Sequence, residues 1–337
     1  MARYEPCGFL FLRSSGAIQP ITMHSGRQLN LREVQREIDL RPGLIPVSID
    51  SDSRRIEWVD LEQYHCYDGS FHAALNAFET FKRGKVERFV TELEVLDTIA
   101  TPANSLAPTG FIFHAGRCGS TLLAQVLARS RTHMVFGEAP AHSQILRMTH
   151  ASTADRLCKN LFLAMGRRRL AAYRSHIIKF TSFNILRFQQ IRGLFPGVPA
   201  LFLFRDPDAM LRSYRRDSPP WIGQGMGFGG NILGSAESAV ETFFRAALSI
   251  GDADFRCLDY ARLTPESLEE IAIFLDAERD SRELAIMRDG FLWDARSGSA
   301  PKPFLPASSS SFSDSRAAAS ALWDLYRKLT LWKPLLV

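Results

Sequence analysis

The chain has 337 residues, of which 46% are hydrophobic and 23% are charged, and its formal net charge is +5. This composition excludes collagen, a coiled coil and wholesale disorder, and no apolar run reaches the roughly 18–20 residues that a transmembrane helix needs. The five cysteines are scattered, so they suggest neither a zinc site nor a disulfide framework, and we expect a reducing, cytoplasmic location. The small excess of Lys and Arg fits an anionic small molecule, a nucleic acid or ordinary surface, and does not choose among them.

Residues 1–105 predict a small α+β module. Two strand-like segments within 43–61 flank a turn and predict a hairpin, and apolar residues at near-helical spacing predict a helix over about 70–83. The segment 101–109, rich in proline and small polar residues, is expected to link this module to a second domain, 106–337. No motif in the module indicates a chemistry, so its role is left open.

The second domain alternates short apolar strands with helix-like segments. The expected strands lie at 110–115, 134–137, 176–180, 200–204 and 255–260. Short apolar strands separated by helices are typical of a buried parallel sheet. The predicted fold class is therefore α/β, with a parallel sheet of about five strands flanked by helices. Two segments interrupt the alternation and are expected to be loops: the glycine-rich 219–234 and the serine-rich 297–315.

The segment FIFHAGRCGSTLLAQ places a glycine-rich turn between the first of these strands and a helix. Such a turn favours an anion, because backbone N–H groups converge at the start of the helix and the helix dipole adds to their effect. The residues expected to hold a phosphate group are Gly116, Arg117, Cys118, Gly119, Ser120 and Thr121. A nucleoside triphosphatase loop would carry a lysine before Ser120, and its absence here disfavours ATP hydrolysis.

A second strand, turn and helix, ALFLFRDPDAMLRSYRRD, carries Arg205 at the end of its strand and Ser213 eight residues further on. Asp206-Pro207 predicts a helix start, and Thr264-Pro265 predicts another. Ligands of an open parallel sheet bind beyond the carboxyl ends of the strands, so we expect Arg205 to face the same crevice as the glycine-rich turn. Pairing of Arg205 with a neighbouring aspartate is the structural alternative.

Together the two motifs resemble the nucleotide sites of sulfotransferases that use 3′-phosphoadenosine 5′-phosphosulfate (PAPS). In that family a loop like GRCGST holds the 5′-phosphosulfate, and an Arg followed eight residues later by Ser holds the 3′-phosphate. FGEAP, whose Glu138 lies 21 residues after Arg117, resembles the Gly-Glu of a branch with a carboxylate base. IIKFTSFN resembles the strand-end lysine segment, and LDYARLTPES resembles a Tyr-x-x-Leu-x-x-x-Pro-Glu stretch. The resemblance covers roughly 109–303.

The resemblance implies PAPS as cofactor, adenosine 3′,5′-bisphosphate (PAP) as product, and no metal. It implies Glu138 as the base that takes the acceptor proton, and Lys179 and Arg117 as groups that stabilise the leaving group. Beyond the loop, it implies cofactor binding by Arg205, Ser213, Tyr260 and Lys302. The sequence departs from the family where no His follows Lys179, which disfavours a histidine base, and where Gly116 replaces the usual proline.

Structural alternatives stay open for single residues. The structural alternative for Glu138 is a carboxylate that a helix N-terminus stabilises. For Lys179 it is a solvent-facing lysine at a strand end, and for Tyr260 it is an ordinary core tyrosine. An isolated His beside a strand is more often structural, so three histidines are set aside as bases: His114, His142 and His176.

The expected function is in-line transfer of a sulfuryl group from PAPS to a hydroxyl of a small-molecule acceptor, with no nucleic-acid or membrane partner. The alternatives are a P-loop-type kinase acting on a small molecule and a non-catalytic nucleotide-binding protein. The missing Gly-Lys pair counts against the kinase. Joint retention of five residues counts against the non-catalytic protein: Arg117, Glu138, Lys179, Arg205 and Ser213. The acceptor and the oligomeric state are left open.

Overall fold

The computed structural model describes residues 27–99, 105–148, 152–219, 222, 234–292 and 321–335. The chain packs into two compact units, and each takes stretches from both sides of residue 105. The first unit comprises 1–64, 78–105 and 140–169, and the second comprises 65–77, 106–139 and 170–337. The division into a 1–105 module and a 106–337 domain stays a prediction, and packing divides the chain differently.

The first unit contains a four-stranded sheet in the order β1-β4-β3-β2. Its strands are β1 (Arg27–Gln28), β2 (Leu44–Asp50), β3 (Arg55–Asp60) and β4 (Arg88–Glu92). The predicted hairpin is confirmed, since β2 and β3 pair antiparallel. The helices of this unit are α1 (Leu31–Leu40), α3 (Leu96–Ile99), α5 (Pro140–Ile145) and α6 (Ser152–Met165). A buried hydrogen bond from the Ile49 amide to the Gln144 side chain (2.8 Å) joins β2 to α5, which explains why a late segment belongs to this unit.

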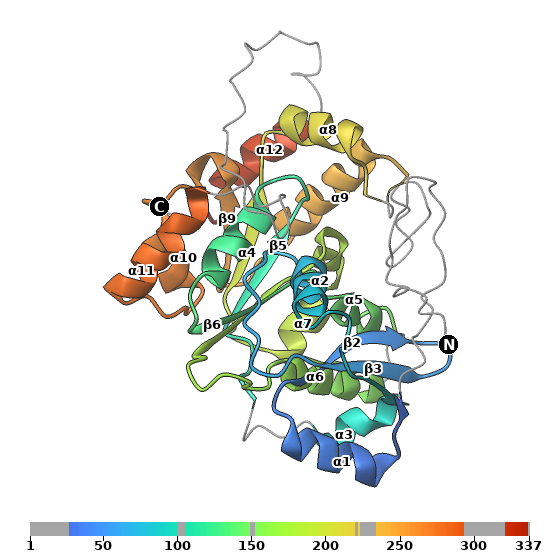
Figure 1. Ribbon diagram of the computed structural model, residues 1–337. Helices are drawn as coiled ribbons and strands as arrows, with labels where there is room; N and C mark the ends of the chain where they lie inside the picture. The colour runs from blue at the N-terminus through green and yellow to red at the C-terminus, as the bar shows by residue number, and fades with distance from the viewer. Residues whose placement is uncertain are drawn as a thin grey trace. The chain divides into compact units, whose positions relative to one another are not determined.

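The second unit is built on a five-stranded sheet, of which Figure 1 labels β5, β6 and β9. The strand order is β6-β7-β5-β8-β9, and every pair is parallel. Its strands are β5 (Gly110–His114), β6 (His133–Gly137), β7 (Ser175–Lys179), β8 (Ala200–Phe204) and β9 (Phe255–Asp259). Each lies within a residue of its predicted position, and the predicted α/β class is confirmed. The strands are short and apolar because helices cover both faces of the sheet.

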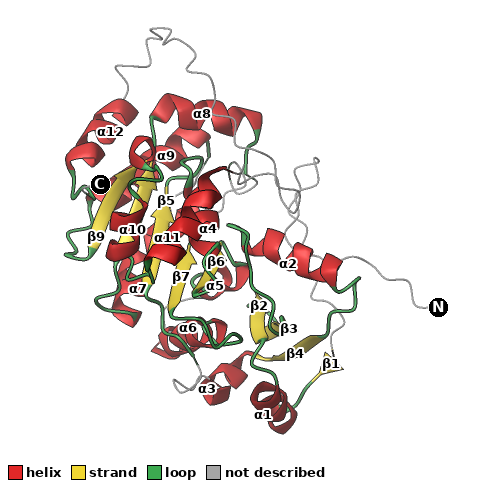
Figure 2. Cartoon of the chain, turned by 60° about the vertical axis from the view of Figure 1, so that its left-hand side comes forward, coloured by secondary structure: helices red, strands yellow, loops and turns green. Residues whose placement is uncertain are grey.

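Helices lie on both faces of this sheet (Figure 2). They are α4 (Ser120–Ala128), α7 (Phe188–Leu194), α8 (Pro207–Arg216), α9 (Ala236–Leu248), α10 (Leu268–Phe274), α11 (Ser281–Arg288) and α12 (Ala321–Leu331). Successive side chains of β5 point to opposite faces of the sheet. Ile112 lies in an apolar cluster with residues of α4, α10 and α11. On the other face, Phe113 stacks on Phe180, with their ring centroids 4.7 Å apart. Helix α2 (Phe71–Phe81) begins in the second unit and ends in the first.

Among the residues that the structure describes, no helix combines the length and the apolar character needed to cross a membrane.

Candidate active site at the carboxyl ends of the strands

The carboxyl ends of the five parallel strands meet at one edge of the sheet, and most of the predicted site residues lie there. Glu138 directly follows β6, Lys179 ends β7, Arg205 directly follows β8, and Tyr260 directly follows β9. The loop between β5 and α4 carries Arg117 at the centre of the same edge. Parallel topology thus brings together residues that are up to 143 positions apart in the sequence, from 117 to 260.

The loop between β5 and α4 has the backbone expected of an anion cradle. Gly116, Arg117 and Gly119 have positive φ values of 79°, 53° and 82°. Gly119 is the N-cap of α4, and no side chain caps this helix. The first N–H groups of α4 therefore have no side-chain acceptor at the cap, and their dipoles favour an anion at this point.

Two tyrosines make both glycines of this loop necessary. A Cβ atom at Gly116 would overlap the hydroxyl of Tyr214, which donates to the Ala115 carbonyl at 3.0 Å. A Cβ atom at Gly119 would lie 2.5 Å from Cε2 of Tyr260. Tyr260 is thus packed against the loop and contributes to its shape, in addition to any contact with a ligand.

The side chains of the loop differ in their burial and in their hydrogen bonds. Cys118 is fully buried, its thiol donates to the Leu203 carbonyl at 3.2 Å, and burial raises the pKa of the thiol to about 11. It is therefore a neutral structural thiol at physiological pH, and only its backbone is available to a ligand. Ser120 is also buried, whereas the Thr121 hydroxyl accepts a hydrogen bond from Lys179 at 3.2 Å.

Glu138 and Lys179 form an ion pair that spans neighbouring strand ends. The Lys179 ammonium donates to Oε1 of Glu138, and the lysine side chain is 1% exposed while the glutamate side chain is 37% exposed. Removal from water raises the pKa of Glu138, but the charge of Lys179 and the approach of His114 outweigh this and hold the pKa well below its usual range. Lys179 is therefore no solvent-facing lysine, and Glu138 is an ionised carboxylate with access to solvent.

His114, which the sequence sets aside as a base, lies between the loop and Glu138. It ends β5 and is buried, its Nδ1 accepts from the Gly116 amide at 3.0 Å, and its Nε2 lies 3.5 Å from Oε1 of Glu138. Its position two residues before the first loop glycine is the only sequence signal for this role. The structure thus joins the loop and the ion pair through one imidazole ring.

Arg117 turns toward the end of α8. Its guanidinium donates to the Asp217 carbonyl and pairs with the Asp217 carboxylate at 2.5 Å, and it also lies over the Tyr214 ring at 5.7 Å. The Arg117 side chain is 18% exposed, whereas that of Asp217 is 73% exposed. A ligand anion at the loop would compete with Asp217 for this guanidinium.

Arg205 lies over the ring of Tyr260, 4.4 Å from the ring centroid, so the two predicted cofactor residues contact each other. The neighbouring Asp206 caps α8 by accepting from the Ala209 amide at 2.7 Å. Ser213 is buried within the same helix. Lys302 lies outside the described residues, as do most of the glycine-rich segment and all of the serine-rich segment.

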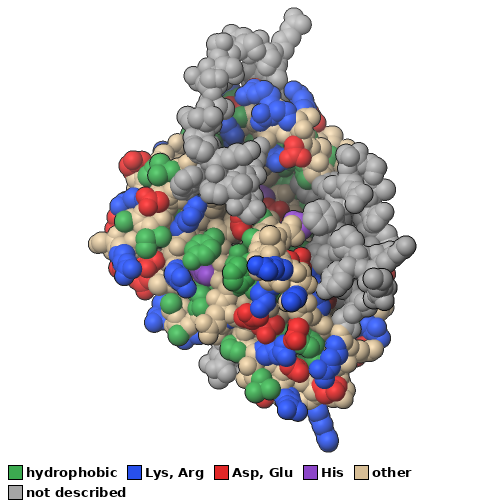
Figure 3. All heavy atoms as spheres, viewed as in Figure 1, with side chains coloured by type: hydrophobic (Ala, Val, Ile, Leu, Met, Phe, Trp, Pro, Cys, Tyr) green, Lys and Arg blue, Asp and Glu red, His purple; other side chains and the backbone are tan. Residues whose placement is uncertain are grey.

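The charges on the face of the molecule seen in Figure 3 are mixed, with Lys and Arg side chains interspersed among Asp and Glu. Within the described ranges, no group of three or more His, Cys, Asp or Glu side chains is arranged to hold a metal ion.

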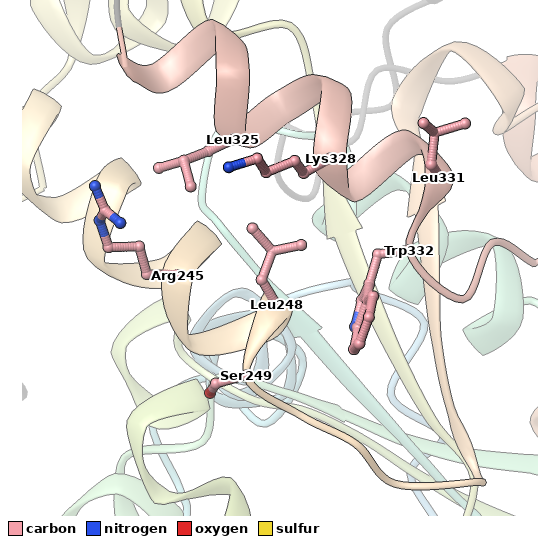
Figure 4. Close-up of a pocket in the computed structure, with 7 residues that line it drawn as sticks. All are labelled: Arg245, Leu248, Ser249, Leu325, Lys328, Leu331 and Trp332. Carbon is pink, nitrogen blue, oxygen red and sulfur yellow. The ribbon is translucent and has the colours of Figure 1, made fainter.

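A separate groove of about 560 Å³ lies between α9 and α12 (Figure 4). Its lining includes Arg245, Leu248, Leu325, Lys328 and Trp332. The end of α9 that lines the groove is joined to the start of β9 by residues 249–254. The groove is therefore near the amino ends of the strands, away from the loop and the ion pair.

No protein-family model matches the sequence, and a search of curated proteins returned no match. Solved structures similar to this chain include a sulfotransferase domain from the curacin biosynthetic pathway, with 17% identity, a TM-score of 0.36, and coverage of 53% of this chain and 77% of that chain. A sulfotransferase from Alicyclobacillus acidocaldarius has 13% identity and a TM-score of 0.36, and the match covers 55% of this chain and 93% of that chain. A mouse sulfotransferase complexed with PAP has 15% identity and a TM-score of 0.31, and the match covers 58% of this chain and 66% of that chain.

Proposed function

We propose that this protein is a sulfotransferase that moves a sulfuryl group from PAPS to a hydroxyl of a small-molecule acceptor. The observation that carries the proposal is the contact between Glu138 and Lys179 beside the start of α4. A buried cation and a solvent-accessible carboxylate, both next to an uncapped helix N-terminus, supply the three groups that this reaction needs. They are a site for the donor anion, a charge for the leaving group, and a base for the acceptor.

The residues at the strand ends fit the donor. The α4 amides and Arg117 would hold the 5′-phosphosulfate, Arg205 and Ser213 the 3′-phosphate, and Tyr260 the nucleoside. The uncapped start of α4 and the positive φ values of the loop support this fit, because they leave N–H groups available to an anion. Contact between Arg205 and Tyr260 supports a shared role, since a guanidinium held on a ring is preorganised for a phosphate.

When bound, PAPS would supply the sulfuryl group and a bisphosphate leaving group. Glu138 would take the proton of the acceptor hydroxyl as the new oxygen–sulfur bond forms, and its partial exposure leaves a path for the acceptor. Lys179 and Arg117 would balance the negative charge that grows on the leaving oxygen as the old sulfur–oxygen bond breaks. Each of these cations has a carboxylate partner in the structure, so each would exchange that partner for the nucleotide.

Cofactor binding is tested by thermal unfolding with adenosine 3′,5′-bisphosphate and, separately, with Mg²⁺ and ATP. A ligand at 100 times its dissociation constant stabilises by about 2.7 kcal/mol, which raises Tm by roughly 5–10 °C for a domain of this size. We expect such a shift with the bisphosphate and a much smaller one with Mg²⁺-ATP. No shift at millimolar bisphosphate would refute the cofactor, and a larger shift with Mg²⁺-ATP would favour the kinase.

Turnover is tested with labelled PAPS and a fractionated metabolite extract, followed by mass spectrometry for a sulfate adduct. Glu138→Gln keeps the shape of the side chain and removes the base, so transfer should fall about 10²–10⁴-fold while bisphosphate binding persists. Glu94→Gln, a surface carboxylate of the first unit paired with Arg54, is the matched control and should leave transfer unchanged. Unreduced transfer by Glu138→Gln would show that another residue is the base.

A further inference from the structure

We propose that His114 is a positioning residue, which holds the Glu138 carboxylate in register with the glycine-rich loop through a neutral imidazole. The inference rests on the proposed function only for its catalytic consequence. The link comprises the hydrogen bond from the Gly116 amide to Nδ1 and the 3.5 Å contact between Nε2 and Oε1 of Glu138, and it is tested separately.

The hydrogen bond between His114 and the loop has only one possible direction. The Gly116 amide can only donate, so Nδ1 of His114, at 3.0 Å, must accept and carry no proton. The neutral ring then has its proton on Nε2. Burial lowers the pKa of His114; the Glu138 carboxylate offsets part of this, and the Lys179 charge adds to it. The ring is therefore neutral with an Nε2–H donor.

The Nε2–H group of His114 faces the Glu138 carboxylate. Nε2 is buried, and among the described residues no atom meets full hydrogen-bond geometry with it. It faces Oε1 of Glu138 at 3.5 Å, and the Phe180 backbone is the competing acceptor. A buried donor without a partner is costly, so a small approach by the carboxylate is favourable. Oε1 is also the oxygen that Lys179 contacts.

Lys179 and His114 affect Glu138 in different ways. Lys179 carries a charge that holds the carboxylate strongly ionised, which makes it a weak base. If Lys179 turns to the leaving group, the carboxylate keeps His114 as a neutral donor. Its orientation is then preserved while its basicity rises. Because Nδ1 accepts from the Gly116 amide and Nε2 carries the proton, His114 has no lone pair for an acceptor hydroxyl and is not itself the base.

Two substitutions divide the functions of the ring. His114→Asn retains an acceptor near the Nδ1 position and loses the donor to Glu138, whereas His114→Gln retains a donor near the Nε2 position and loses the acceptor for Gly116. We expect His114→Asn to bind adenosine 3′,5′-bisphosphate within about twofold of wild type and to transfer about 10- to 100-fold more slowly, with a displaced acid limb in its pH–rate profile. His114→Gln should transfer faster than His114→Asn. Equal turnover and equal pH profiles for wild type and His114→Asn would overturn the proposal.

A measurement without turnover keeps the proposal testable if PAPS is not the cofactor. Nitrogen-15 spectra of labelled histidine, assigned by the missing signal in His114→Asn, should show a neutral Nε2–H tautomer from pH 6 to 8. Glu138→Gln should move the Nε2 signal, whereas Glu94→Gln should not. A proton on Nδ1, a charged ring at pH 7, or an Nε2 signal insensitive to Glu138→Gln would each refute the link. A tautomer as expected with no bisphosphate binding would refute the proposed function and leave the link standing.

Discussion

Replacing Gly119 by alanine tests the shape of the loop, because two separable costs meet at this position. Its φ of 82° is a left-handed conformation, which costs an L-residue about 1–2 kcal/mol. The new Cβ would also lie 2.5 Å from Cε2 of Tyr260, and crowding of this kind costs about 1–3 kcal/mol. The sum predicts destabilisation by about 2–5 kcal/mol, with displacement of Tyr260 and hence of Arg205, whose guanidinium lies over that ring.

Gly197→Ala is the matched control, since Gly197 has a φ of 77° in the same unit and a Cβ there would meet nothing within 4 Å. It should carry the backbone cost alone. The difference between the two variants, about 1–3 kcal/mol, corresponds to roughly 2–12 °C in Tm by calorimetry. Adding Tyr260→Ala should bring the cost of Gly119→Ala down to that of Gly197→Ala in a double-mutant cycle. Equal Tm values for the two glycine variants, or no relief by Tyr260→Ala, would refute the reasoning.

Two further predictions concern the ion pairs of the site. Asp217→Asn removes the carboxylate partner of Arg117, and this carboxylate is itself solvent-exposed. Because an ion pair with an exposed partner contributes about 0.2–1 kcal/mol, the dissociation constant of adenosine 3′,5′-bisphosphate should fall roughly 1.5- to 5-fold by calorimetric titration. An unchanged or higher constant would contradict this. The depressed pKa of Glu138 contributes stability above the unfolded pKa of about 4.3, and this contribution is lost as pH falls toward the folded pKa. Wild type should therefore lose more Tm than Glu138→Gln between pH 6 and pH 3, and parallel Tm curves would show that the pair adds nothing.

The parallel sheet could be predicted from the sequence because its strands are short, mostly apolar and separated by helices. β8 has the bounds that its apolar run predicts, and Asp206-Pro207 starts α8 as expected. Thr264-Pro265 does not start a helix. Thr264 and Ser267 bond to each other through side chain and backbone, which makes a turn, and α10 begins only at Leu268. The same polar residue types cap helices and close turns, so the sequence pattern alone does not distinguish the two.

Division of the chain into packing units could not be predicted from the linker-like composition near residue 105. Gly69 shows the reason: a Cβ there would overlap the Thr121 carbonyl, and one at Gly137 would overlap the Gly69 carbonyl. The backbone around Gly69 therefore passes between the start of α4 and the end of β6, beside Glu138. Such a close approach of two backbone segments depends on long-range packing, and it cannot be predicted from the presence of one glycine among many.

The residues of the site could be identified from the sequence, but the side chains with which they form ion pairs could not. Arg117 and Lys179 were expected to face a polyanion, and in the structure each is paired with a carboxylate. A bisphosphate must therefore replace existing partners, so binding and base strength are coupled: a nucleotide that draws Lys179 away removes the main charge that lowers the pKa of Glu138. The carboxylate would become a stronger base when the donor is in place and stay a weak one otherwise. This coupling cannot be inferred from the net charge of +5, because the net charge counts each charged residue without regard to the ion pairs that it forms in the fold.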